Sequence, residues 1–235
     1  MILITRHKKD STYLSNQLDK NKISYFFYPL TNFSILKKNI KSSKEIFIIA
    51  SVKAILFLKK NNQNFFKNKK FIVIGKKTHE RLRDFGCQNI LLTANSSVEL
   101  LKKIKKRKLQ RLNLRYLSSN VYNKDFIKNL RKQNHQVRVT RVYETIPIRR
   151  LNKELIYKIN NEQIRSLVFY SQFSLSTFLK LCKLEKVDLK NQKNISFYCM
   201  SERIAKPAMK LNLQVFYPSI PSDEKLIKIM NKTLL

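Results

Sequence analysis

Glycine is nearly absent from this chain of 235 residues, which has only Gly75 and Gly86 and no tryptophan. Loops that hold phosphate groups need glycine at several neighbouring positions, because the backbone must approach the phosphate closely. The scarcity of glycine therefore excludes a P-loop and a GxGxxG dinucleotide fingerprint.

Cysteine is also scarce, with Cys87, Cys182 and Cys199 far apart and no CxxC spacing. An odd number of scattered cysteines argues against a disulfide framework and against a zinc site, and it indicates a reducing compartment. Long apolar runs are missing as well, because the longest one, residues 46–58, is interrupted by Lys53. We expect a soluble cytoplasmic protein that does not enter a membrane.

Acidic residues are few, with 15 Asp and Glu against 49 Lys and Arg, so the formal net charge is +34. Such a surplus fits a nucleic-acid partner, since Lys and Arg neutralise phosphates. A general enrichment in Lys, Asn and Ile explains the same charge, and the densest run, residues 102–108, reads as a solvated helix end. The charge fits any polyanion, including a small polycarboxylate.

The side chains of common catalytic sites are not clustered along the sequence. The acidic residues show no pairs at metal or glycosidase spacing, the three histidines are isolated, and no GxSxG elbow is present. This pattern favours chemistry that depends on positioning the substrate.

Short apolar runs alternate with segments of helical period, which predicts an α/β protein with mostly parallel strands. The ten predicted strands cover residues 2–6, 23–28, 45–50, 71–75, 89–92, 112–117, 136–143, 166–170, 194–199 and 214–217.

The pattern repeats within the chain, in permuted order. A long unit at 47–104 returns at 167–230, where Ser51 matches Ser171 and Gly75 matches Ser201, and a short strand-helix-strand unit also occurs twice. We expect two flavodoxin-like parallel-sheet domains joined by a two-stranded hinge, with a cleft between them. Domain A is discontinuous, 1–29 plus 149–235; domain B is 33–141; the hinge linkers are 30–32 and 142–148.

The carboxyl ends of the predicted strands carry hydroxyl and amide residues, at the edge where α/β sheets bind ligands. Capping of the following helices explains most of them. Capping does not explain the cations beside the caps, which are Arg6, Lys53, Lys76, Lys77 and Arg203. Cations at helix N-termini suit a ligand with carboxylate groups.

Seven segments, in this order and spacing, resemble the uroporphyrinogen-III synthase family over nearly the whole chain: MILITR, IIASVKA, VIGKKT, RVYETIP, FYSQFSLSTF, CMSERIA and IPSDEKL. The VYETIP segment is the most distinctive. The chain departs from the family's common pattern at Val52, Gln172, Ser118, Ser119 and Ile204, and where many relatives have Gly-Pro it has Ser201 and Glu202.

The resemblance implies a lyase of haem biosynthesis. Its reaction cyclises linear hydroxymethylbilane to uroporphyrinogen III, with inversion of ring D and loss of water, and needs no cofactor. Tyr143 matches the family's tyrosine, whose phenol assists loss of the hydroxyl as a general acid, unless it is a packed hinge aromatic. The expected substrate-binding residues are Arg6, Ser51, Lys53, Gly75, Lys76, Lys77, Thr78, Ser118, Ser119, Ser171 and Ser201.

The partners follow from the same resemblance: the polycarboxylate hydroxymethylbilane as substrate, and hydroxymethylbilane synthase as the protein that hands it over. We expect a monomer, because neither half shows an extra apolar stripe. Two alternatives remain at this point. One is a two-domain polyanion or RNA-binding module without catalysis, and the other is a relative of the family that has lost its activity.

Overall fold

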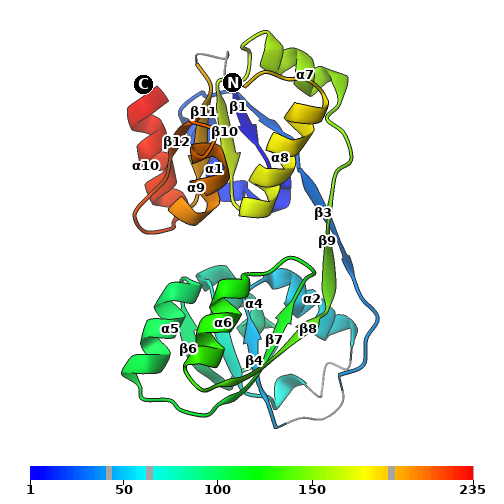
Figure 1. Ribbon diagram of the computed structural model, residues 1–235, viewed down its shortest axis with the longest axis vertical. Helices are drawn as coiled ribbons and strands as arrows, with labels where there is room; N and C mark the ends of the chain where they lie inside the picture. The colour runs from blue at the N-terminus through cyan, green and yellow to red at the C-terminus, as the bar shows by residue number, and fades with distance from the viewer. Residues whose placement is uncertain (41–43, 62–65, 190–193, 235) are drawn as a thin grey trace. The chain divides into compact units, whose positions relative to one another are not determined.

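The computed structural model of the protein describes residues 1–40, 44–61, 66–189 and 194–234. The chain divides into two compact units (Figure 1). Unit 1 consists of Met1–Asn32 together with Ile146–Leu235, and unit 2 consists of Phe33–Thr145. Unit 1 therefore contains both ends of the chain.

Unit 2 is a parallel five-stranded sheet in the order β6-β5-β4-β7-β8, with helices between the strands. Its elements are β4 (Ile46–Ile49), α2 (Val52–Lys60), β5 (Phe71–Ile74), α4 (Lys76–Asp84), β6 (Ile90–Ala94), α5 (Ser97–Lys106), β7 (Asn113–Ser118), α6 (Lys124–Lys132) and β8 (Gln136–Arg141).

Unit 1 is also a parallel five-stranded sheet, in the order β12-β11-β10-β1-β2. Its first segment holds β1 (Ile2–Ile4), the 3-10 helix η1 (Lys8–Asp10), α1 (Thr12–Lys20) and β2 (Tyr25–Phe27). Its second segment holds α7 (Lys153–Asn160), β10 (Ser166–Phe169), α8 (Gln172–Leu184), β11 (Ser196–Cys199), α9 (Glu202–Met209), β12 (Gln214–Phe216) and α10 (Asp223–Leu234).

The two sheets have the same spatial arrangement of strands, but the chain begins at a different strand of that arrangement in each unit. Strands β4, β5, β6, β7 and β8 of unit 2 occupy the places of β10, β11, β12, β1 and β2 in unit 1. The predicted α/β class with two parallel sheets is confirmed. Counted along the chain, unit 1 has the flavodoxin order 2-1-3-4-5, whereas unit 2 has the order 3-2-1-4-5. The order reverses between β1 and β10 in unit 1 and between β4 and β7 in unit 2.

Each sheet is covered on both faces, because apolar side chains alternate along its strands. In β4, Phe47 and Ile49 pack with α2 and α4, while Ile48 packs with α5 and α6. In unit 1, α8 and α9 cover one face, and α1 and α10 cover the other. The pair α5 and α6 therefore occupies the place in unit 2 that α10 and α1 occupy in unit 1.

The segments that pass from one unit to the other pair as a two-stranded sheet, β3 (Thr31–Ile35) with β9 (Tyr143–Pro147). The Leu36 N–H donates to the Val142 carbonyl and the Ile148 N–H donates to the Leu30 carbonyl, so the two segments run in opposite directions. The predicted strand 136–143 is wrong at its end, because β8 stops at Arg141 and Tyr143 begins β9.

Within the described ranges, no helix combines the length and apolar character that are needed to cross a bilayer.

Candidate functional site

The site in unit 2 begins where the strand order reverses. Strands β4 and β7 lie side by side in parallel, with Ile49 opposite Leu117. Two residues further on, the same register brings Ser51 beside Ser119 at the carboxyl edge of the sheet. In open α/β sheets this reversal leaves a crevice in which ligands bind.

Tyr143 brings its phenol to this point. The side chain is 8% exposed, and its hydroxyl lies beside the hydroxyls of Ser51 and Ser119. Burial raises the pKa of Tyr143 above its ordinary value, and the two serine hydroxyls act in the opposite direction. The phenol is therefore protonated at neutral pH and can donate a hydrogen bond.

The two serines also make hydrogen bonds of their own. The Ser119 hydroxyl donates to the Val121 carbonyl at 2.6 Å. The Ser51 oxygen accepts from the Lys53 N–H at 3.2 Å as the N-cap of α2, which leaves the Ser51 proton available to a neighbouring oxygen. These bonds hold both serines in place beside Tyr143.

The backbone around Tyr143 is held from both sides. The Val142 N–H donates to the Ser118 carbonyl at 2.9 Å. The amide of Asn120 accepts from the Thr145 N–H at 2.8 Å and donates to the Thr145 carbonyl at 3.2 Å. Asn120 positions Tyr143 through the chain, a role that the sequence analysis missed because an Asn after a strand has the pattern of an ordinary turn residue.

The end of β5 offers a second polar turn in unit 2. Gly75 is the N-cap of α4 and has a φ of +96°. Residues other than glycine rarely adopt this backbone conformation. Lys76 and Lys77 follow in the exposed first turn, and the Thr78 side chain is buried. This helix N-terminus therefore carries both free N–H groups and two cations.

Lys53, in the first turn of α2, places its ammonium group 4.8 Å from the centre of the Phe33 ring. It adds a further cation beside Ser51, at the start of the helix that follows β4.

Unit 1 has a different constellation at the corresponding reversal, between β1 and β10. The register that sets Ile4 opposite Val168 brings Arg6 beside Tyr170. The Arg6 guanidinium lies 3.7 Å from the centre of the Tyr170 ring, and its Nε donates to the Ser11 hydroxyl at 3.1 Å. Burial raises the pKa of Tyr170, as does the charge of Asp223, while Arg6 opposes them.

Tyr170 is a second residue that the sequence analysis missed. Its signal was available, because it ends a predicted strand just before Ser171 and Arg6 ends the first strand. The other predicted residues of unit 1 lie along the same edge. Ser171 caps α8 by accepting from the Ser174 N–H at 3.0 Å, and Ser201 is the N-cap residue of α9 without a side-chain capping bond.

The predicted site residues thus fall into separate groups. In unit 2, the Ser51 and Ser119 hydroxyls lie beside Tyr143, whereas Ser118 is not among the groups that act on its phenol. Among the described side chains, no three His, Cys, Asp or Glu residues gather as metal ligands would. The three cysteines are free and buried.

The family model for uroporphyrinogen-III synthase HemD matches residues 11–228 of this chain. Two similar solved structures are uroporphyrinogen-III synthetase from Helicobacter pylori and a mutant uroporphyrinogen III synthase from Thermus thermophilus. The first is 14% identical, with 98% of each chain covered and a TM-score of 0.65. The second is 10% identical, with 99% of this chain and 98% of that chain covered and a TM-score of 0.61.

No curated protein matches the sequence. At these identities the two structures establish the fold alone, while the family model covers most of the chain and confirms the resemblance found in the sequence. The chain belongs to the uroporphyrinogen-III synthase family.

Proposed function

We propose that Tyr143 is the general acid of this synthase, a lyase of tetrapyrrole biosynthesis. The observation that carries the proposal is the position of its buried phenol, beside the Ser51 and Ser119 hydroxyls at the point where the strand order of unit 2 reverses. The raised pKa keeps the proton on the phenol until a substrate oxygen accepts it.

The reaction begins with loss of the hydroxyl of linear hydroxymethylbilane. In our proposal the Tyr143 O–H donates its proton to that hydroxyl, the carbon–oxygen bond breaks, and water leaves with the phenol's proton. The Ser51 hydroxyl, which lies beside the Tyr143 oxygen, stabilises the charge that develops on the phenol. The proton returns to Tyr143 when ring closure with inversion of ring D releases a proton from carbon, so the net change is loss of one water.

The acetate and propionate groups of the substrate need cationic and N–H partners. In unit 2 we assign this role to the N-terminus of α2 with Lys53, and to the N-terminus of α4 with Gly75, Lys76 and Lys77. In unit 1 we assign it to Arg6 and to the N-terminal turns after Ser171 and Ser201. Thr78 and Ser118 are buried residues of unit 2, and we assign them to the same substrate-binding edge of that unit.

Three further features are proposed from the family. Hydroxymethylbilane synthase hands over the substrate, the protein works in the cytoplasm, and it is a monomer. Sedimentation velocity tests the last of these, with a single species near 28.0 kDa expected and a larger one contradicting it.

The test is a coupled assay that supplies fresh hydroxymethylbilane, oxidises the products and separates uroporphyrin isomers I and III. We expect the wild-type protein to raise isomer III above the spontaneous isomer I. Tyr143→Phe removes only the hydroxyl and should lower kcat about 100-fold, within the range of general acid catalysis. Tyr157→Phe is the matched control, because Tyr157 is 60% exposed on α7.

Two outcomes contradict the proposal in different ways. Turnover of Tyr143→Phe within twofold of the wild type would leave Tyr143 a packing residue. Isomer I alone, from wild-type protein with a cooperative unfolding transition, would overturn the assignment of the synthase activity.

A further inference from the structure

The densest positive charge of the described chain lies on the outer side of α5 and α6, in unit 2. Between Ser97 and Lys132 the sequence has 12 Lys and Arg against 2 Asp and Glu. We call the exposed cations of this region the α5–α6 face: Lys102, Lys105, Lys106, Arg107, Lys108, Arg111, Lys124, Lys128, Arg131 and Lys132.

The internal repeat provides a control for the general lysine enrichment of the chain. Helices α5 and α6 together carry 8 Lys and Arg against 2 acidic residues. Helices α10 and α1, which cover the corresponding face of unit 1, carry 4 lysines against 3 acidic residues. Composition acts on both helix pairs alike, so it does not account for a charge that is concentrated on one of them.

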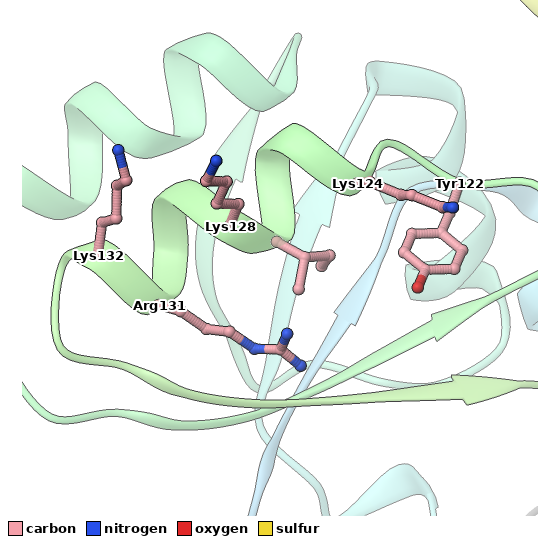
Figure 2. A pocket seen from close by; sticks show the side chains of 6 residues that line it. Tyr122, Lys124, Lys128, Arg131 and Lys132 are labelled. Carbon is pink, nitrogen blue, oxygen red and sulfur yellow. The ribbon is translucent and has the colours of Figure 1, made fainter.

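A hollow of about 460 Å³ lies along α6, lined by Tyr122, Lys124, Ile127, Lys128, Arg131 and Lys132. In Figure 2, Lys128 and Lys132 point to one side of α6 and Arg131 points to the other. The Arg131 guanidinium donates to the Val137 carbonyl at 2.9 Å. Of the four cations that line the hollow, Arg131 is therefore anchored to the backbone, and the other three are lysines exposed on α6.

Lys124, Lys128 and Lys132 form a row at intervals of four residues, which a helix spaces roughly 6 Å apart. Like charges at this interval destabilise a helix. In the part of the chain that the structure describes, no ion pair offsets the row. The repulsion within the row thus lowers the stability of α6, and no ion pair among the described residues compensates for it.

Tyr122 adds an aromatic ring to this cationic hollow, and the ring packs edge-on against Tyr116 at 6.3 Å between centroids. A row of cations with an aromatic ring at one end is the combination that binds single-stranded nucleic acid, in which cations follow the phosphates and a base stacks on the ring. We propose that the α5–α6 face binds single-stranded nucleic acid, as a second function of this synthase.

The experiment measures the fluorescence anisotropy of a labelled oligouridine as the protein is added, over a series of salt concentrations. One triple variant is Lys124→Gln, Lys128→Gln and Lys132→Gln. The matched control is Lys225→Gln, Lys228→Gln and Lys232→Gln on α10, which removes the same charge from three exposed lysines of unit 1. Synthase turnover and the unfolding midpoint report whether each variant is folded.

We expect the α6 variant to bind at least tenfold more weakly. Its plot of log affinity against log salt should be shallower by about 2, the loss of three phosphate contacts. The α10 variant should stay within twofold of the wild type. Tyr122→Leu should weaken binding by about fivefold or more without changing the salt slope, because stacking releases no counterions.

Each contrary result overturns the proposal. An equal loss in both triple variants would show that only net charge matters. Equally tight binding of a polyglutamate peptide, with Tyr122→Leu unchanged, would assign the face to an acidic protein. Lower synthase kcat/KM in the folded α6 variant, without loss of oligouridine binding, would assign it to capture of the substrate.

Discussion

Units 1 and 2 use the same sheet plan and the same layering of helices, yet they differ at both their polar edges and their outer faces. At the reversal of strand order, unit 2 has the Tyr143 phenol beside two serine hydroxyls, and unit 1 has Arg6 stacked on Tyr170. Unit 2 also has 28 Lys and Arg against 6 acidic residues, compared with 21 against 9 in unit 1.

The difference teaches which features the fold requires. Apolar alternation on the strands is common to both units, because both sheets must be covered on two faces. The residues past the strand ends and on the outer helix surfaces are free to differ, because they carry little of the packing. Function is therefore to be sought where the two units disagree.

We expect the largest loss of stability from breaking a buried ion pair that unit 2 has and unit 1 lacks. Arg115 in β7 pairs with Glu45, and both are buried, whereas Leu3 occupies the corresponding place in unit 1. Arg115→Leu leaves the buried Glu45 carboxylate with only the exposed Arg138, at 3.7 Å, so the free energy of unfolding in urea should fall by about 3–5 kcal/mol.

Two controls separate the lost pairing from poor packing. Glu45→Leu with Arg115→Leu removes both charges and should recover most of the stability. Arg138→Leu, which removes the exposed second partner of Glu45 at 3.7 Å, should cost under about 1 kcal/mol. A cost below about 1 kcal/mol for Arg115→Leu alone would contradict the prediction.

The buried thiols should make the stability depend on pH, which is a smaller effect. Unit 1 contributes more to it than unit 2, because it holds two of the three cysteines. Burial raises the pKa of Cys182 and Cys199, both in unit 1, to about 12 and that of Cys87 in unit 2 to about 11. Above pH 9 the thiols of the unfolded chain lose their protons while the folded ones keep them. Stability should therefore fall as pH rises, approaching about 1.4 kcal/mol per pH unit for each thiol.

Urea unfolding between pH 8 and 10 measures this slope, and replacing Cys182 and Cys199 by Ala should remove most of it. The folded protein should not react with a thiol reagent at pH 8. Rapid labelling of any cysteine under native conditions would contradict the burial argument.

The smallest effect is expected on the KM of the synthase, from changes at Tyr170. It distinguishes Tyr170, whose ring matters, from Tyr143, whose hydroxyl matters. If Tyr170 acts by supporting Arg6, its ring matters and its hydroxyl does not. Tyr170→Leu should raise KM for hydroxymethylbilane about threefold to tenfold with kcat little changed, since it removes a cation–π contact. Tyr170→Phe should leave KM within twofold, and equal effects of the two variants would refute the role.

Much of the fold was predictable from local patterns. Each of the ten predicted strands overlaps an observed one, because buried parallel strands are short apolar runs between helical segments. Strand β3 was not among the predicted strands, because it is not a continuous apolar run. Its residues alternate between partly buried and exposed, and they include Asn32 and Ser34. The strand predicted over 136–143 ran past the break at Val142, where the expected hinge linker begins, because β8 and β9 are separated by a single apolar residue.

The amino-acid sequence by itself determined the class of fold, the permuted repeat and the family, because these depend on periodicity and on motifs read along the chain. Only the tertiary structure decided that Tyr143 meets Ser51 and Ser119, and that Arg6 lies on Tyr170. These residues come from separate segments of the chain. Parallel strand register and the pairing of β3 with β9 bring them together, and no local pattern contains that information.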